Sequence, residues 1–399
     1  MRIIWGEMKK IWNWKMIAII GVVCVMFYIM FMSYYVEYYK KGNHPQAELV
    51  IYAEELTRRY GTSITPEQVA GFIAVERASL ATEAEAYFGT MPVFASAGVY
   101  SLDDYLVIQE ERWEREVTQA ESDAYWPLMG EECGYLGFKL DALRHYEQGY
   151  GFRPNASANP DSFYHELSEK EQKRFDESIE NGEHLSILSY WTYSNTNDYL
   201  KFFSVLLVLS VLILVSPLLV SDRHANLHYL QYSSKYGRAI IRGQLIATLL
   251  SAFALTTLLI LVFGGIYSQN GTHLFWNNEI NSDFNIGMYT VFRLTYGAKV
   301  LAAIAMMYVL AAGVSSFAFM LSRFSGNLIT LVMKLVPVFA ALVFLCDAVF
   351  NDLFEMLYNK IYLLLRVFGA EAYVSGTIAV IAFAATWFVV RREKRTDVV

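Results

Sequence analysis

Residues 202–219 read FFSVLLVLSVLILVSPLL, an apolar run without a charged side chain. A helix that crosses the hydrocarbon core of a bilayer needs about 20 mostly apolar residues. Five further stretches of the 399-residue chain have a similar length and composition, which gives six candidate membrane helices at residues 16–36, 201–220, 239–267, 298–321, 327–350 and 373–391. The sequence therefore predicts an all-α polytopic membrane protein with six transmembrane helices.

The composition agrees with this prediction. Hydrophobic residues make up 55% of the chain and charged residues 18%, whereas an ordinary soluble domain is about 25% charged. The length leaves room for one sizeable domain outside the membrane in addition to the six helices. The longest stretch between two candidate membrane helices, residues 37–200, is the segment that would form it.

The positive charges predict how the chain is oriented. Lys and Arg outnumber Asp and Glu in four stretches, residues 1–15, 221–238, 322–326 and 392–399. All four fall on one side of the membrane if every candidate helix spans it, and short basic segments stay on the cytoplasmic side. Both termini are therefore expected in the cytoplasm, and three segments are expected outside: 37–200, 268–297 and 351–372.

The N-terminal residues 1–15 mix Trp5, Trp12 and Trp14 with lysines. This pattern is typical of an amphipathic helix that lies in the membrane interface. The first apolar segment could instead be a cleaved signal peptide. It is longer than a signal sequence requires, and no small-x-small cleavage site precedes Glu37, so a retained anchor is the better interpretation.

The segment 37–200 has the sequence signals of a mainly helical extracellular domain. Thr65-Pro66-Glu67-Gln68 is a capping box with proline at the first helical position, which predicts a helix to about residue 88. An earlier helix is expected from His44-Pro45 to near Gly61. Ser101 predicts a third helix that continues to about residue 125, and Ser168 predicts a fourth. We expect loops and one short helix over residues 127–160. The only cysteine here, Cys133, leaves no internal disulfide, which fits a bacterial surface.

Motifs for catalysis or metal binding are weak. The chain has no P-loop of its own and no His-Glu-x-x-His motif. His224 and His228 could share a helix face as metal ligands, but a polar helix without a third nearby ligand explains them better. Glu110-Glu111-x-x-x-Arg115 resembles an intramembrane metalloprotease motif, yet it lies outside the apolar segments. We therefore expect no enzyme activity, no metal and no cofactor in this chain.

Two charged residues fall inside a candidate membrane helix, and such residues suggest function by default. Lys334 lies near the inner end of its helix and can extend its ammonium to the interface. Asp347 lies near the outer end of the same helix, within reach of water. Both remain candidate sites, although a structural role is the simpler interpretation for each.

The basic loop 221–238 is the strongest functional signal. Leu227, Leu230 and several tyrosines alternate with polar residues, which predicts a short amphipathic helix that Gly237 can terminate. An ordinary interfacial loop would have the same pattern. The loop starts with Asp222 and ends with Ser233-Ser234-Lys235-Tyr236-Gly237-Arg238.

With this loop and six helices, the chain resembles the permease subunits of type-2 ABC transporters. In that family the loop after the second helix is a coupling helix that begins with an acid and ends in Ser/Thr-x-x-Gly-Arg. The family pattern also has a glycine soon after the acid and a lysine after the final arginine. Here Asn226 stands at that glycine position and Gln244 at that lysine position. The resemblance implies an ATPase-coupling role for seven residues: Asp222, Arg223, Leu230, Ser233, Lys235, Gly237 and Arg238.

The resemblance also implies partners and a reaction. A separate ABC ATPase subunit would bind ATP, and a second permease chain would complete a homodimer or heterodimer. The expected function is ATP-driven export of a peptide, lipid or drug-like substrate across a bacterial plasma membrane, with residues 351–372 as a re-entrant segment. We expect no nucleic-acid partner. The alternative is a non-transporting receptor or immunity protein whose extracellular domain binds a ligand.

Overall fold

The computed structural model describes residues 2–41, 44–112, 115–225, 237, 240–285 and 288–393. Over these residues the protein is helical, and its only β pairing consists of two isolated bridges. The chain divides into two compact units. We call them the membrane unit, Met1–Val36, Asn195–Gly271 and Ala298–Val399, and the insert unit, Glu37–Ser194 and Thr272–Gly297.

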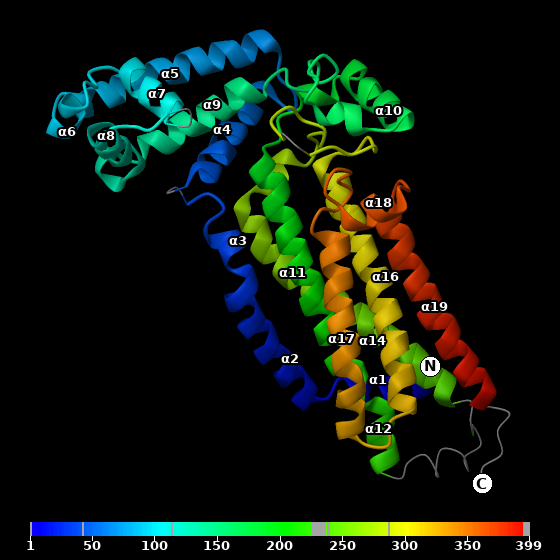
Figure 1. The fold of residues 1–399 in the computed structure, drawn as a ribbon. Coiled ribbons are helices and arrows are strands. Elements are labelled where there is room, and N and C mark those ends of the chain that lie inside the picture. Colours follow the sequence, from blue (N-terminus) through cyan, green and yellow to red (C-terminus); the bar gives the residue numbers. More distant parts are fainter. Residues whose placement is uncertain are drawn as a thin grey trace. The chain divides into compact units, whose positions relative to one another are not determined.

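Among the described residues, six helices are long and apolar enough to cross a membrane, which confirms the predicted fold class (Figure 1). Their elements are α2 (Trp14–Phe27) with the π-helical turn η1 (Tyr28–Met32), α11 (Tyr190–Val215) followed by α12 (Pro217–His224), α14 (Ile240–Leu259) continuing through the π-helical turn η6 (Ile260–Gly264) into α15 (Gly265–Tyr267), α16 (Tyr296–Arg323), α17 (Leu328–Phe350) and α19 (Ala370–Glu393). These helices account for every apolar segment of the sequence.

Helix α1 (Arg2–Ile11) precedes the first of them, as the amphipathic pattern predicts. Asn13 separates the two helices, because its side chain accepts a hydrogen bond from the amide of Met16 and so caps α2. The short helix α3 (Tyr34–Glu37) follows η1. Helix α18 (Lys360–Leu365) lies between α17 and α19, where Asn359 caps its start.

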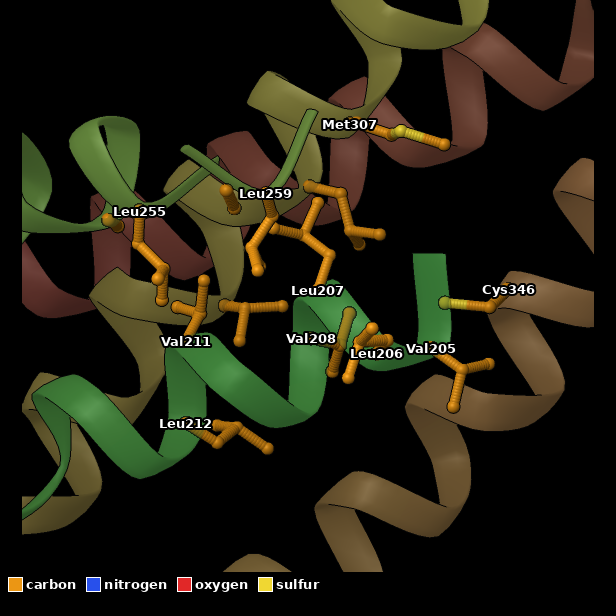
Figure 2. Close-up of a cluster of buried hydrophobic side chains, with 14 of the residues drawn as sticks. Val205, Leu206, Leu207, Val208, Val211, Leu212, Leu255, Leu259, Met307 and Cys346 are labelled. Atoms are coloured by element: carbon orange, nitrogen blue, oxygen red, sulfur yellow. The ribbon is translucent and has the colours of Figure 1, made fainter. Parts of the chain in front are cut away.

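The core of the membrane unit is built around α11. Figure 2 shows the side chains of α11 among Leu255 and Leu259 of α14, Met307 of α16 and Cys346 of α17. In the most apolar stretch of the span formed by α11 and α12, 83% of the residues are buried, whereas in that of α17 only 6% are buried. Helix α11 is therefore the central helix of this unit, and α17 leaves most of its apolar surface uncovered.

The insert unit contains the capped helices that the sequence predicts. Helix α4 (Pro45–Tyr60) is followed by α5 (Pro66–Phe88), and the capping boxes at Thr65, Ser101 and Ser168 are all present. The remaining elements are α6 (Pro92–Ser96), α7 (Leu102–Glu111), α8 (Gln119–Met129), η2 (Glu131–Cys133), α9 (Leu136–Gly149), η3 (Phe163–Glu166), α10 (Glu169–Glu180), η4 (Glu183–Leu185) and η8 (Thr272–Phe275). Helix α9 packs against both α4 and α5 (Figure 1).

The prediction of one helix from residue 102 to 125 is wrong. Helix α7 ends at Glu111, and α8 begins after Thr118. Thr118 and Glu121 form a capping box of their own, in which the Thr118 amide donates to Glu121 at 2.7 Å. This reciprocal pair satisfies the free amides of a new helix start, so it stabilises a break where periodicity alone suggests continuity.

Residues 272–297 are part of the insert unit because buried polar groups hold them there. The Arg153 guanidinium donates to the carbonyls of Ser282 at 3.2 Å and Asn285 at 3.3 Å. The Asp283 carboxylate accepts from the amides of Gly151 at 2.9 Å and Arg153 at 3.3 Å. Burial of a charged pair is tolerated only with such additional hydrogen bonds. The loop between α15 and α16 therefore completes the core of this unit.

Candidate functional site

The predicted coupling segment is described at its two ends. Asp222 and Arg223 lie in the last turn of α12, and Gly237 has a φ of +46°, in the left-handed region that favours glycine. The other predicted coupling residues, Leu230, Ser233, Lys235 and Arg238, lie outside the described residues. The site can therefore be built from the two helix ends that flank the segment, in α12 and α14.

Asp222 is buried in a polar cluster that joins three helices. Its carboxylate accepts from the Lys10 ammonium of α1 at 3.2 Å and from the Gln244 amide of α14 at 2.8 Å. Glu7, also buried, accepts from the same two groups, at 2.8 Å from Lys10 and 3.1 Å from Gln244. We call these four residues, Glu7, Lys10, Asp222 and Gln244, the α1 junction.

The charges of the α1 junction are mutually dependent. The buried carboxylates of Glu7 and Asp222 both accept from the Lys10 ammonium and from the Gln244 amide. Partial burial disfavours the charged form of Lys10, but the hydrogen bond and charge of Glu7 and the charge of Asp222 outweigh it and raise the pKa of Lys10. Breaking such a pair leaves an uncompensated carboxylate.

Arg223 connects the same turn of α12 to the end of α16. Its guanidinium donates to the carbonyls of Arg323 at 2.7 Å and Ser325 at 2.8 Å. The carbonyl between them, of Phe324, accepts from Lys334 of α17 at 2.7 Å. Carbonyl groups at a helix end lack intrahelical partners, and cations there are favourable. The extended side chain of Lys334 thus places its ammonium group at the end of the membrane segment.

Asp347, the other predicted membrane charge, lies near the opposite end of α17. It pairs with Lys360 of α18 at 2.6 Å, and the two side chains are 38% and 66% exposed. Exposed ion pairs contribute little to stability. The structure does not bring Asp347 together with Lys334 or with the α1 junction, so the charges of α17 form two separate sites.

Sequence reasoning missed three residues of the α1 junction and one further buried charge. Glu7 is the one acid among the basic residues at the N-terminus, a signal that could have identified it. Lys10 and Gln244 give no comparable signal. Lys299 is fully buried in the first turn of α16 and lies near Asp352. It falls at the edge of its apolar segment, where a lysine side chain usually reaches the membrane interface, so the sequence position does not indicate burial.

Within the described ranges, no cluster of three or more histidine, cysteine or acidic side chains could hold a metal ion. His224 is exposed, and His228 lies outside those ranges. The last turn of α12 is thus bonded through Asp222 to α1 and α14 and through Arg223 to the end of α16. No protein-family model, curated protein or solved structure matches this chain.

Proposed function

We propose that the chain is the membrane-spanning permease subunit of an ATP-driven type-2 ABC transporter that exports a peptide, lipid or drug-like substrate. The observation that supports this most is the α1 junction. A subunit that receives a movement from a cytoplasmic ATPase needs a loop whose displacement reaches the membrane helices, and Asp222 ties one flank of that loop to α1 and α14.

Two neighbouring residues of α12 would pass its movement to different helices. Asp222 and Arg223 are adjacent, but Asp222 binds α1 and α14 while Arg223 binds the end of α16. A displacement of α12 would therefore strain both sets of bonds at once. ATP binding in the partner subunit would act by favouring the arrangement of these helices that it contacts best. The predicted coupling segment, residues 221–238, would receive the ATPase subunit.

The remaining parts of the proposal concern topology and assembly. Both termini would be cytoplasmic, as the distribution of Lys and Arg predicts. A second permease chain would complete the conduit, and the uncovered surface of α17 is apolar enough to face either lipid or another chain. The ATPase subunit would bind ATP, and the bilayer would be the plasma membrane of a bacterium.

The test is purification of the affinity-tagged chain from native membranes, with mass spectrometry of the proteins that accompany it. A co-purifying P-loop ATPase whose ATP hydrolysis changes when Arg223→Ala replaces the wild-type chain would support the proposal. A matched control is Lys334→Ala, which removes a bond to the adjacent carbonyl without touching α12. Reproducible absence of any ATPase would contradict the proposal and favour a ligand-binding receptor.

A further inference from the structure

The membrane unit contains an apolar groove between α2 and α14 whose lining is known in detail. Its volume is about 460 Å³. One wall includes Ile17, Gly21 and Cys24 of α2. The other includes Leu255 and Leu258 of α14 and Val262 of η6. Gly21 has no neighbouring atom within 4 Å of the position that a Cβ would take. The groove is therefore open at the level of Gly21.

Two π-helical turns line one end of the groove. Turn η1 of the first helix and turn η6 of the third lie opposite each other, with the rings of Tyr28 and Phe263 at 6.1 Å. Isolated π-helical turns are rare and occur often at functional sites. From Ile17 to Ile29 the groove follows about 18 Å of helix at 1.5 Å per residue. One leaflet of a bilayer has a hydrocarbon depth of about 15 Å.

The other end of the groove adjoins a cationic surface. Trp12 lines the groove and lies three residues from both Lys9 and Lys15 in the chain. Arg2, Lys9 and Lys15 are exposed, whereas Glu7, the one acid among residues 2–17, is buried in the α1 junction. Exposed Trp5 and Trp14 add the aromatic side chains that lie at headgroup level in membranes. The residues that precede the groove in the chain, 2–15, therefore expose basic side chains and no acidic one.

We infer that the α2–α14 groove binds one acyl chain of an anionic phospholipid, whose headgroup lies against Lys9 and Lys15. The apolar walls match an acyl chain, the depth matches one leaflet, and the exposed charge selects an anionic headgroup. The inference concerns a lipid that stays bound to the protein. It does not depend on transport or on an ATPase partner.

The experiment uses the full chain in phosphatidylcholine vesicles that contain a minor fraction of phosphatidylglycerol with a photoreactive acyl chain. After illumination, mass spectrometry should find crosslinks in 12–29 and 255–266 and a higher yield for phosphatidylglycerol than for phosphatidylcholine with the same acyl group. Gly21→Phe should abolish these crosslinks by filling the groove. Val22→Phe, which adds the same ring at a neighbouring exposed position outside the groove, should preserve them.

Lys9→Gln and Lys15→Gln test the headgroup. Each removed charge should lower the preference for phosphatidylglycerol about fivefold, because a cation near an anionic lipid surface contributes about 1 kcal/mol. Equal yields for the two lipids in the wild-type protein, or undiminished crosslinks in Gly21→Phe, would overturn the inference. If Gly21→Phe does not fold, competition of unlabelled phosphatidylglycerol against unlabelled phosphatidylcholine on the wild-type protein decides between the same two results.

Discussion

Lys10 is the residue whose removal should disturb the α1 junction most. Lys10→Met leaves the buried carboxylates of Glu7 and Asp222 facing each other without their shared cation. Because the Lys10 side chain is 38% exposed and water screens part of the interaction, we expect a loss of about 1–2 kcal/mol, below that of a fully buried pair. Thermal unfolding of the detergent-solubilised protein measures it.

Lys9→Met is the matched control for this change, because Lys9 lies on the same helix and is exposed. Its unfolding temperature should stay close to that of the wild-type protein. A second variant, Lys10→Met with Asp222→Asn, also removes one of the two neighbouring carboxylates. It should recover part of the stability that Lys10→Met loses. Equal stability of Lys10→Met and wild type would contradict the structural role that we assign to the junction.

Two partly buried histidines of the insert unit, His145 and His184, should make its stability depend on pH. Burial lowers the pKa of both His145 and His184, although the charge of Asp283 partly opposes this at His184. The folded state therefore binds fewer protons than the unfolded state between the lowered pKa and about 6.5, so stability falls as the pH drops through that window. Unfolding measured between pH 7 and pH 5 should show this loss.

Replacing both histidines by glutamine should flatten the dependence, because glutamine does not titrate. Burial also raises the pKa of Asp283, against the opposing charge of Arg153. That shift has the opposite sign: the folded carboxyl retains its proton more readily, so acidification between the raised pKa and the ordinary value stabilises the fold. An unchanged pH dependence in the double glutamine variant would show that other groups cause it.

At the scale of elements, helices α16 and α19 approach each other closely. A Cβ added at Gly313 would lie 2.9 Å from the Cα of Ala379, so the two helix backbones touch there. Small residues allow this contact between membrane helices. Gly313→Ala should separate the helices and lower the unfolding temperature by several degrees, which corresponds to the cost of about 1–3 kcal/mol for overpacking a core.

Gly376→Ala is the control, because Gly376 lies within α19 and has no neighbour within 4 Å of a new Cβ. There the alanine should be neutral or slightly stabilising, since alanine favours a helix over glycine. If both substitutions have the same effect, close packing is not what Gly313 provides.

Signals that act within a few residues were predictable from the sequence, and pairings between distant residues were not. The capping boxes at Thr65, Ser101 and Ser168 are local, and the structure has all three. The box at Thr118 is equally local, and it contradicts the prediction of one helix from residue 102 to 125. Lys10 and Asp222 are 212 positions apart. Neither their sequence spacing nor their residue types indicate that contact.

At the scale of the whole molecule, the insert unit should require both of its chain segments. Phe284 packs on Tyr146 with ring centroids 4.7 Å apart, and Asp283 accepts hydrogen bonds from the loop at Arg153. A fragment of residues 37–194 lacks Asp283 and Phe284. It should unfold at a lower temperature than the same fragment joined to residues 272–297 through a flexible linker. Circular dichroism of the two fragments makes the comparison, and equal stability would contradict the prediction.

The order of synthesis gives the central position of α11 a consequence for assembly. Helix α11 becomes the most enclosed helix, yet α14, α16 and α17, which enclose it, are translated later. Its side chains must first face lipid, where an unpaired polar group is costly. The hydroxyls of Ser204 and Ser216 donate to carbonyls of their own helix, at Lys201 and Leu212. These two hydroxyls thus carry their hydrogen-bond partners into the bilayer before the neighbouring helices are made.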